Sequence, residues 1–218
     1  MFCAMSNRLV LAGLLLAGVV AAVWVWSRIR YDFRPKRLVT VEEGFVYRSG
    51  QISARLIGRV LDEKGIDTVV SLVGYDPARP DHVAEKAAVD ARGIRFVNVN
   101  LHGNGTGDPE RYLEALLALH QTREAGGQAL VHCASGVRRA AGVVAVYRVL
   151  LRGDEPARVA REELDRFVGP AGLWGPRPAV ESQIVGYLNE HMALFARRLV
   201  EEGALAEVPT PIPRFPMR

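Results

Sequence analysis

Short apolar, β-branched stretches alternate with helical repeats through most of this 218-residue chain. Runs such as TVVSLV are typical of strands that are buried on both faces of a sheet. The predicted strands are 45–48, 68–73, 94–100 and 128–132. One predicted helix is capped by Ser53, and another begins at Pro109. Two more predicted helices cover 81–92 and 139–151. A strand-helix order repeated in this way predicts an α/β fold with a mainly parallel central sheet flanked by helices.

Two further helical segments, 154–167 and 178 to about 202, extend the same domain. The tail over 205–218 is rich in proline and is expected to be irregular. Hydrophobic residues make up 49% of the chain, which is enough for one substantial core and too little for two large domains. We therefore expect one folded domain over 45–204.

An apolar run, LVLAGLLLAGVVAAVWVW, extends from Leu9 to Trp26 without a charged side chain. Its length is at the lower limit for a helix that spans a membrane. Trp24 and Tyr31 resemble the aromatic residues found where such helices leave the lipid. The sequence thus predicts a tail over 1–8, a transmembrane anchor over 9–27 and a basic juxtamembrane linker over 28–44.

The charges around this run favour an uncleaved anchor. Arg8 alone stands in front of it, whereas signal peptides carry their positive charge there. The basic residues that follow it are Arg28, Arg30, Arg34, Lys36 and Arg37. By the positive-inside rule, a single pass through the cell membrane leaves the domain on the cytoplasmic side. The alternatives are a signal peptide cleaved near Ala21 and Ala22, with a periplasmic or exported domain, and a buried helix of the protein.

The positive charge of the chain is modest, with a formal net charge of +4 at pH 7. Arginine carries almost all of it and suits contacts with phosphate or anionic lipid, but such an excess does not predict nucleic-acid binding. There are two cysteines, and Cys3 precedes the apolar run. No disulfide is therefore expected, and Cys133 should be a free thiol.

The segment VHCASGVRRAAG at 131–142 places Cys133 between a predicted buried strand and a predicted helix. Gly136 gives the loop conformational freedom, so its N–H groups can turn inward around an oxyanion at the helix N-terminus. The same field lowers the pKa of a cysteine, and Arg139 can hold two phosphate oxygens with its planar guanidinium. His132 is interpreted as a buried residue that orders the loop. The alternative for Cys133 is a small buried hydrophobe.

The string HCASGVRR resembles the signature loop of cysteine-based protein tyrosine phosphatases, and the compact length resembles their dual-specificity branch. Upstream, VYRSGQIS and GIDTVVSLVG are similar to the start of bacterial, fungal and plant atypical dual-specificity phosphatases. The resemblance covers roughly 45–170. It implies a two-step reaction through a cysteinyl-phosphate, with no metal or organic cofactor. It makes Cys133 the nucleophile and Arg139 the phosphate clamp. The N–H groups that would cradle the phosphate belong to Ala134, Ser135, Gly136, Val137 and Arg138.

This chain departs from the family pattern at two positions. Most relatives have serine or threonine directly after the loop arginine, where this chain has Ala140, which implies slower turnover. Relatives carry an aspartate as general acid in the loop before the preceding helix, where this chain has Asn104 within HGNGTGDPE. Asp108 is the nearest carboxylate and the predicted general acid. Its alternative role is to cap the helix that begins at Pro109.

The predicted function is that of a membrane-tethered phosphatase acting on phosphotyrosine or another phosphoprotein. Ala134, Ser135 and Val137 are less basic than the loops of relatives that act on highly charged inositol lipids. The predicted anchor keeps a second possibility open, a phosphatase of lipid or inositol phosphates. Ala140 keeps open a third, a catalytically weak phosphate-binding module. A rhodanese-like sulfurtransferase is disfavoured by the spacing of the arginine.

Overall fold

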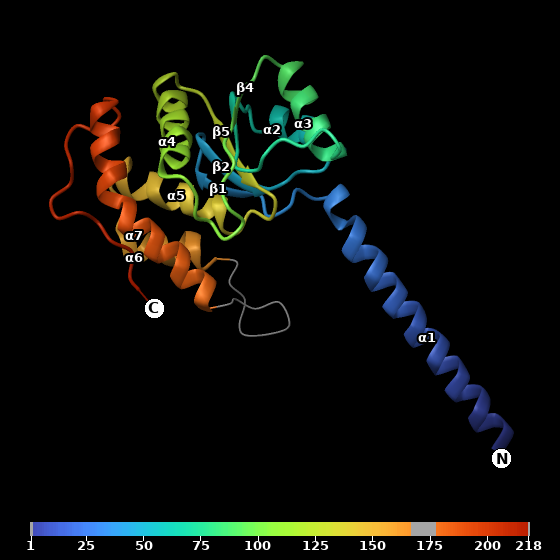
Figure 1. Ribbon diagram of the computed structural model, residues 1–218. Helices are drawn as coiled ribbons and strands as arrows, with labels where there is room; N and C mark the ends of the chain where they lie inside the picture. Colours follow the sequence, from blue (N-terminus) through green and yellow to red (C-terminus); the bar gives the residue numbers. More distant parts are fainter. Residues whose placement is uncertain (1, 167–177, 218) are drawn as a thin grey trace.

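The computed structural model describes residues 2–166 and 178–217, and Figure 1 shows an α/β domain from which one helix projects. Over these residues, the domain is built on a five-stranded sheet with the order β1-β2-β5-β3-β4. The strands are β1 (Val39–Glu42), β2 (Val46–Gly50), β3 (Thr68–Ser71), β4 (Arg95–Asn98) and β5 (Ala129–Cys133). Strands β2, β5, β3 and β4 run parallel, and β1 pairs antiparallel with β2. The mainly parallel sheet predicted from the sequence is confirmed.

Strand β1 lies within 28–44, the segment that the sequence analysis treats as a linker. Its residues VTVE pair Val39 with Arg48 and Thr40 with Tyr47. A run of four residues carries little strand signal of its own, and β1 forms because β2 offers a free edge with unpaired backbone groups. The folded part of the chain therefore includes the end of the linker as well as the predicted domain.

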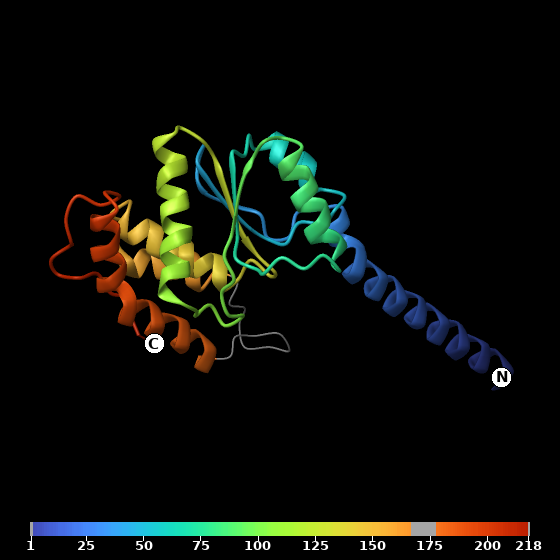
Figure 2. The same ribbon diagram turned by 45° about the horizontal axis from the view of Figure 1, so that its top comes forward.

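Helices cover both faces of the sheet (Figure 2). Helices α2 (Ile57–Glu63) and α3 (Pro80–Asp90) lie on one face, and α4 (Pro109–Glu124), α5 (Arg139–Leu150) and α7 (Pro178–Glu201) on the other. Successive strand residues point to opposite faces. Val69 and Leu130 accordingly pack against α2 and α3, whereas Val70 and Val131 join the larger core beneath α4, α5 and α7.

The helix predicted over 154–167 is shorter than expected. Its regular part, α6, covers Pro156–Val159, and a π-type turn continues it over Ala160–Leu164. Glu155 starts the helix, because its carboxylate accepts hydrogen bonds from the N–H groups of Ala157 and Arg158. Phe167, at the end of the predicted helix, lies outside the described residues.

Buried charges join this turn to the sheet. The guanidinium of Arg48, a fully buried residue of β2, lies 2.7 Å from the carboxylate of Glu163. Arg148 of α5 contacts the same carboxylate at 2.9 Å and that of Asp154 at 2.8 Å. A buried charge that loses its partner is strongly destabilising, so these four residues constrain one another. The arginine of the YRSG segment therefore fixes α5 and the turn to β2.

The C-terminal tail is irregular, as predicted, but it packs against the domain. Over 205–217 it contains neither helix nor strand. The amide of Asn189 on α7 donates to the carbonyl of Phe215 at 2.9 Å and accepts from its N–H at 2.7 Å. The Phe215 ring is buried in the main core. The tail thus covers part of α7.

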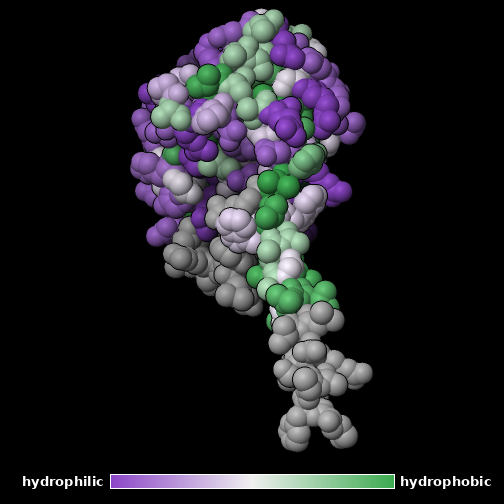
Figure 3. Space-filling view, turned by 90° about the vertical axis from the view of Figure 1, so that its right-hand side faces the viewer, coloured by the Kyte–Doolittle hydropathy of each residue, from purple (hydrophilic) through white to green (hydrophobic). Residues whose placement is uncertain are grey.

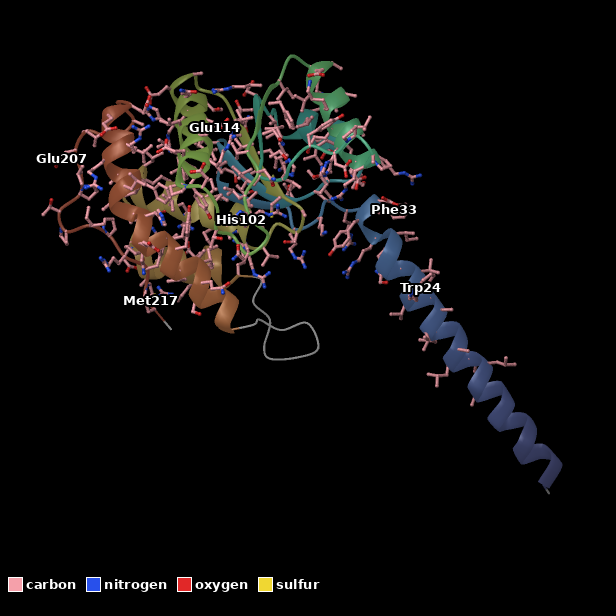
Figure 4. All side chains as sticks on the ribbon, viewed as in Figure 1. Trp24, Phe33, His102, Glu114, Glu207 and Met217 are labelled. Carbon is pink, nitrogen blue, oxygen red and sulfur yellow. The ribbon has the colours of Figure 1, made fainter. Side chains whose placement is uncertain are left out.

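Helix α1 (Phe2–Ile29) extends away from the domain as one continuous helix (Figure 1). Its described apolar side chains are exposed, including Leu14 at 67% and Trp24 at 60%. Figure 3 shows hydrophobic residues along this helix, and in Figure 4 Trp24 lies on it well clear of the domain, whereas Phe33 lies at the junction. None of the helices, over the residues described, combines the length and the apolar character that a membrane crossing requires. The anchor predicted over 9–27 does not gain support from this finding. The side chains of residues 2–11, which include the start of that anchor, lie outside the described ones.

Candidate active site

The loop that carries Cys133 connects β5 to α5 at the carboxyl edge of the parallel strands. In open α/β sheets this edge is where ligands bind. Cys133 is the last residue of β5 and is paired in register with Gly50 of β2. Gly136 has a φ of 74°, and a Cβ atom there would lie 2.5 Å from the nitrogen of Gly50. Only glycine fits at position 136, because both the backbone angle and the close approach to β2 exclude a side chain.

The Cys133 sulfur faces the N–H groups of its own loop. The residue is 1% exposed, and the Gly136 N–H donates a hydrogen bond to Sγ at 3.2 Å. Burial disfavours the thiolate, but the N–H groups of Ala140 and Gly136 and the charge of Arg139 outweigh it, so the pKa of Cys133 is lowered. The geometry therefore favours a thiolate over an inert buried thiol.

Arg139 begins α5 and reaches across the end of the sheet. Its Nη1 donates to the carbonyl of Leu72, just after β3, at 3.1 Å, and to that of Leu101, after β4, at 3.4 Å. These bonds fix one side of the planar guanidinium beside the Cys133 loop. A guanidinium held in this way is suited to grip oxygens of a phosphate with its other N–H groups.

The predicted cradle residues form the loop between Cys133 and Arg139, and the N–H groups of Ser135 and Gly136 bond with the sulfur. Gly136 is buried, and the other four are partly exposed: Ala134, Ser135, Val137 and Arg138. A surface that admits a ligand requires such exposure. Ala140 is fully buried and has no hydroxyl, but its backbone N–H still bonds with the Cys133 sulfur. The backbone therefore serves the thiolate even though the usual hydroxyl is missing.

His132 is buried beneath the loop, as expected, and its partner is a residue that the sequence analysis did not identify. Its Nε2 lies 3.1 Å from the carboxylate of Glu85 on α3. Burial disfavours the imidazolium, but the charge of Glu85 prevails and raises the pKa of His132. Glu85 is buried on the same stripe of α3 as His82 and Val89, and a carboxylate on a buried stripe is the signal that marks it. The pair links α3 to the strand that ends in Cys133.

The loop over 101–108, between β4 and α4, packs against the Cys133 loop. Asn104 organises it by accepting from the Thr106 N–H at 3.2 Å and from the Thr106 hydroxyl at 2.8 Å. The carbonyl of Gly105 accepts from the buried Tyr112 hydroxyl. A Cβ atom at Gly105 would lie 3.3 Å from the Cβ of Arg138. Asn104, at the position where an acid was expected, thus holds the shape of the loop.

Asp108 occupies the N-cap of α4. Its carboxylate accepts from the Glu110 N–H at 3.0 Å, and the residue is exposed. Among the hydrogen bonds of the described residues, none joins Asp108 to Cys133 or Arg139. The capping role that the sequence left open is therefore present, and a catalytic role for Asp108 stays a prediction.

Two linker residues, Lys36 and Arg37, contact the Cys133 loop from outside. The Lys36 ammonium donates to the carbonyl of Ala134 at 3.0 Å, and Arg37 donates to that of Ser135 at 2.9 Å. Both were predicted only as part of a basic flank, because nothing local in the sequence indicates a contact across almost a hundred residues.

Over the described residues, no group of three histidine, cysteine, aspartate or glutamate side chains is arranged to hold a metal ion.

No family model and no curated protein matches this sequence. Among solved structures, the core catalytic domain of the PP-IP phosphatase SIW14 from S. cerevisiae has a TM-score of 0.57 at 17% identity, covering 78% of this chain and 95% of that one. The active form of Tk-PTP has a TM-score of 0.52 at 21% identity, covering 70% and 96%. DUSP15 has a TM-score of 0.51 at 19% identity, covering 75% and 95%. The chain therefore has the fold of these phosphatases.

The state of the Cys133 thiol can be measured directly. In a Cys3→Ser variant, where Cys133 is the remaining cysteine, we expect iodoacetate to alkylate it well below neutral pH, because thiolate is then already present. Phosphate or vanadate should protect it, since an oxyanion fills the space in front of the sulfur. Mass spectrometry of the modified peptide across a pH series measures both effects. An ordinary thiol profile that oxyanions do not change would contradict the interpretation of the loop.

Proposed function

We propose that this protein is a phosphatase that hydrolyses a phosphomonoester through a cysteinyl-phosphate intermediate. The observation that carries the proposal is the buried Cys133 sulfur, bonded by N–H groups of its own loop, with Arg139 fixed beside it. The phosphatase fold supports it independently. A loop of this shape binds an oxyanion where the nucleophile can reach it.

In the first step the Cys133 thiolate attacks phosphorus, so an S–P bond forms and the P–O bond to the leaving group breaks. Arg139 and the loop N–H groups stabilise the charge on the phosphoryl oxygens. Asp108, as general acid, donates a proton to the departing oxygen. Water then attacks phosphorus, Asp108 takes a proton from it, and the S–P bond breaks to release inorganic phosphate and the thiolate. The absence of a hydroxyl at Ala140 is expected to slow this second step.

Phosphotyrosine, or another phosphoprotein, is the substrate class we favour, because the loop side chains Ala134, Ser135 and Val137 add no charge of their own. Lipid or inositol phosphates are the second candidate. Lys36 and Arg37 bring positive charge next to the loop, which favours a more highly charged substrate. One structural neighbour is named a PP-IP phosphatase. A catalytically weak phosphate-binding module is the third candidate, because of Ala140.

We also propose that α1 tethers the domain to the cell membrane, with the domain on the cytoplasmic side. The support is the exposed apolar surface of this helix, which includes Leu14, Val19 and Trp24 and which water solvates poorly. The basic residues that follow the helix favour the cytoplasmic orientation.

Replacing the nucleophile tests the activity. We expect Cys133→Ser to reduce turnover by about 10³-fold or more, because a serine hydroxyl is not ionised at neutral pH, while substrate binding is retained. The assay compares wild type and variant on phosphotyrosine peptides, phosphoserine peptides and phospholipids, with Cys3→Ser as the matched control. Equal turnover by wild type and Cys133→Ser would show that Cys133 is not the nucleophile.

Replacing Asp108 by Asn separates catalysis from capping, because asparagine is also a good N-cap. We expect turnover of phosphotyrosine to fall by about 10²-fold and that of an activated aryl phosphate far less, since its leaving group needs no proton. Glu110→Gln, in the first turn of α4 two residues further on, is the control. Equal losses on both substrates would indicate a structural cap. No loss would mean that the proton comes from water or from a carboxylate near the start of α3, either Asp76 in the loop before it or Asp81 in its first turn.

Membrane tethering is tested by fractionation. We expect the full chain to sediment with membranes and to resist carbonate extraction, and protease added outside spheroplasts to leave the domain intact. Digestion of the domain from outside would reverse the proposed orientation. A soluble product that begins near Val23 would establish a cleaved signal instead.

A further inference from the structure

The linker residues Lys36 and Arg37 bond to two successive carbonyl groups of the Cys133 loop. The Lys36 Nζ lies 3.0 Å from the oxygen of Ala134, and Arg37 Nη1 lies 2.9 Å from that of Ser135. Both contacts are partly buried, and Arg37 has a φ of 50°, an uncommon backbone angle for a residue other than glycine. Such an angle persists where the surrounding contacts over-determine it.

These two carbonyls belong to the peptide units whose N–H groups face the sulfur. A trans peptide is planar, so its C=O and N–H groups point in opposite directions. Holding the Ser135 carbonyl outward aims the Gly136 N–H inward, where it donates to Cys133 Sγ at 3.2 Å. Holding the Ala134 carbonyl outward aims the Ser135 N–H inward, and this group also bonds with the sulfur. The linker side chains therefore act on the amides that bind the sulfur.

The packing around Gly50 fits this arrangement closely. The Gly50 N–H donates to the carbonyl of Lys36 at 2.7 Å. A Cβ atom at Gly50 would lie 2.8 Å from Cδ of Lys36 and 2.9 Å from the carbonyl group of Ser135. The glycine of the YRSG segment thus leaves room for the Lys36 stem and the loop to meet at the end of β2.

We propose that Lys36 and Arg37 are positioning residues that hold the loop amides in the orientation that binds the thiolate and the phosphoryl oxygens. The proposal rests on the proposed function for the role of the loop in catalysis. The effect of Lys36 and Arg37 that it describes is on the shape of the loop itself. It also makes the segment next to α1 part of the working site, because Lys36 lies 5.4 Å from the centre of the Tyr31 ring, two residues beyond that helix.

Charge and geometry must be separated in the test, because Lys36 also acts on Cys133 through space. Among the described residues, Arg139 of α5, His132 of β5 and Arg48 of β2 also interact with Cys133 through their charges, whereas the nearby Tyr112 of α4 is uncharged at neutral pH because burial raises its pKa. A through-space effect of charge weakens at high ionic strength, whereas a misaligned amide does not recover there. Lys36→Met and Arg37→Met keep apolar stems and remove the donors, and Arg37→Lys keeps both charge and donor. Arg34→Met removes an exposed charge from the same linker and is the control.

The experiment uses the full chain in detergent, with the Cys3→Ser change in every variant. It measures the pH midpoint of Cys133 alkylation and the dissociation constant of vanadate at low and high salt. For Lys36→Met and Arg37→Met we expect the midpoint to rise by about one pH unit and vanadate to bind about tenfold more weakly, at both salt concentrations. Arg37→Lys should retain most of the vanadate affinity, and Arg34→Met should match the parent protein.

Unchanged vanadate affinity in both methionine variants would overturn the proposal, as would a loss that disappears at high salt. Thermal melts monitored by circular dichroism establish that each variant is folded, and Arg37→Met alone decides the question if Lys36→Met does not fold. These readouts do not need turnover. A parent protein that binds vanadate but hydrolyses no phosphomonoester would contradict the proposed function, while the effect of the linker on the loop would still be measured.

Discussion

The hydrogen bonds from backbone N–H groups to the Cys133 sulfur are the interaction on which the rest of the site depends. A thiolate in a buried position is unfavourable unless nearby dipoles and charges compensate for the lost water. Here the N–H groups of Ala140 and Gly136 and the Arg139 guanidinium provide that compensation. The same groups point to where a phosphoryl oxygen would sit. Under the proposed function, the arrangement that stabilises the thiolate would therefore also bind the substrate.

The fold holds this loop from several sides. The parallel register sets Cys133 opposite Gly50, so the carboxyl ends of β5 and β2 meet where the loop begins. Beneath the loop, His132 is paired with Glu85 of α3. Buried ion pairs tie Arg48 and Arg148 to the turn after α6. Because each buried charge needs its partner, these elements resist separate movement, and the loop rests on a fixed base.

Much of this was readable from the sequence, because the responsible patterns are local. Apolar β-branched runs indicated the strands of the parallel sheet, and glycines indicated where its helices end. HCASGVRR indicated the loop, since a cysteine, a glycine and an arginine at these spacings occupy a strand-to-helix turn. The shorter α6 and the strand β1 were not anticipated, because a turn fixed by Glu163 and an edge strand fixed by β2 depend on distant partners. The apolar segment that forms the exposed helix α1 was also visible in the sequence. Its insertion into a membrane stays a prediction.

The sequence by itself determined the fold class and singled out Cys133 and Arg139 as the predicted nucleophile and phosphate clamp, since each follows from residues within a few positions of one another. Only the tertiary structure decided that Glu85 pairs with His132, that Asn104 shapes the loop before α4, and that Lys36 and Arg37 hold the outer carbonyls of the Cys133 loop. Lys36 and Ala134 are 98 positions apart along the chain. No local pattern encodes such a pair, because an ammonium on a linker finds a particular carbonyl only after the sheet has brought the two together.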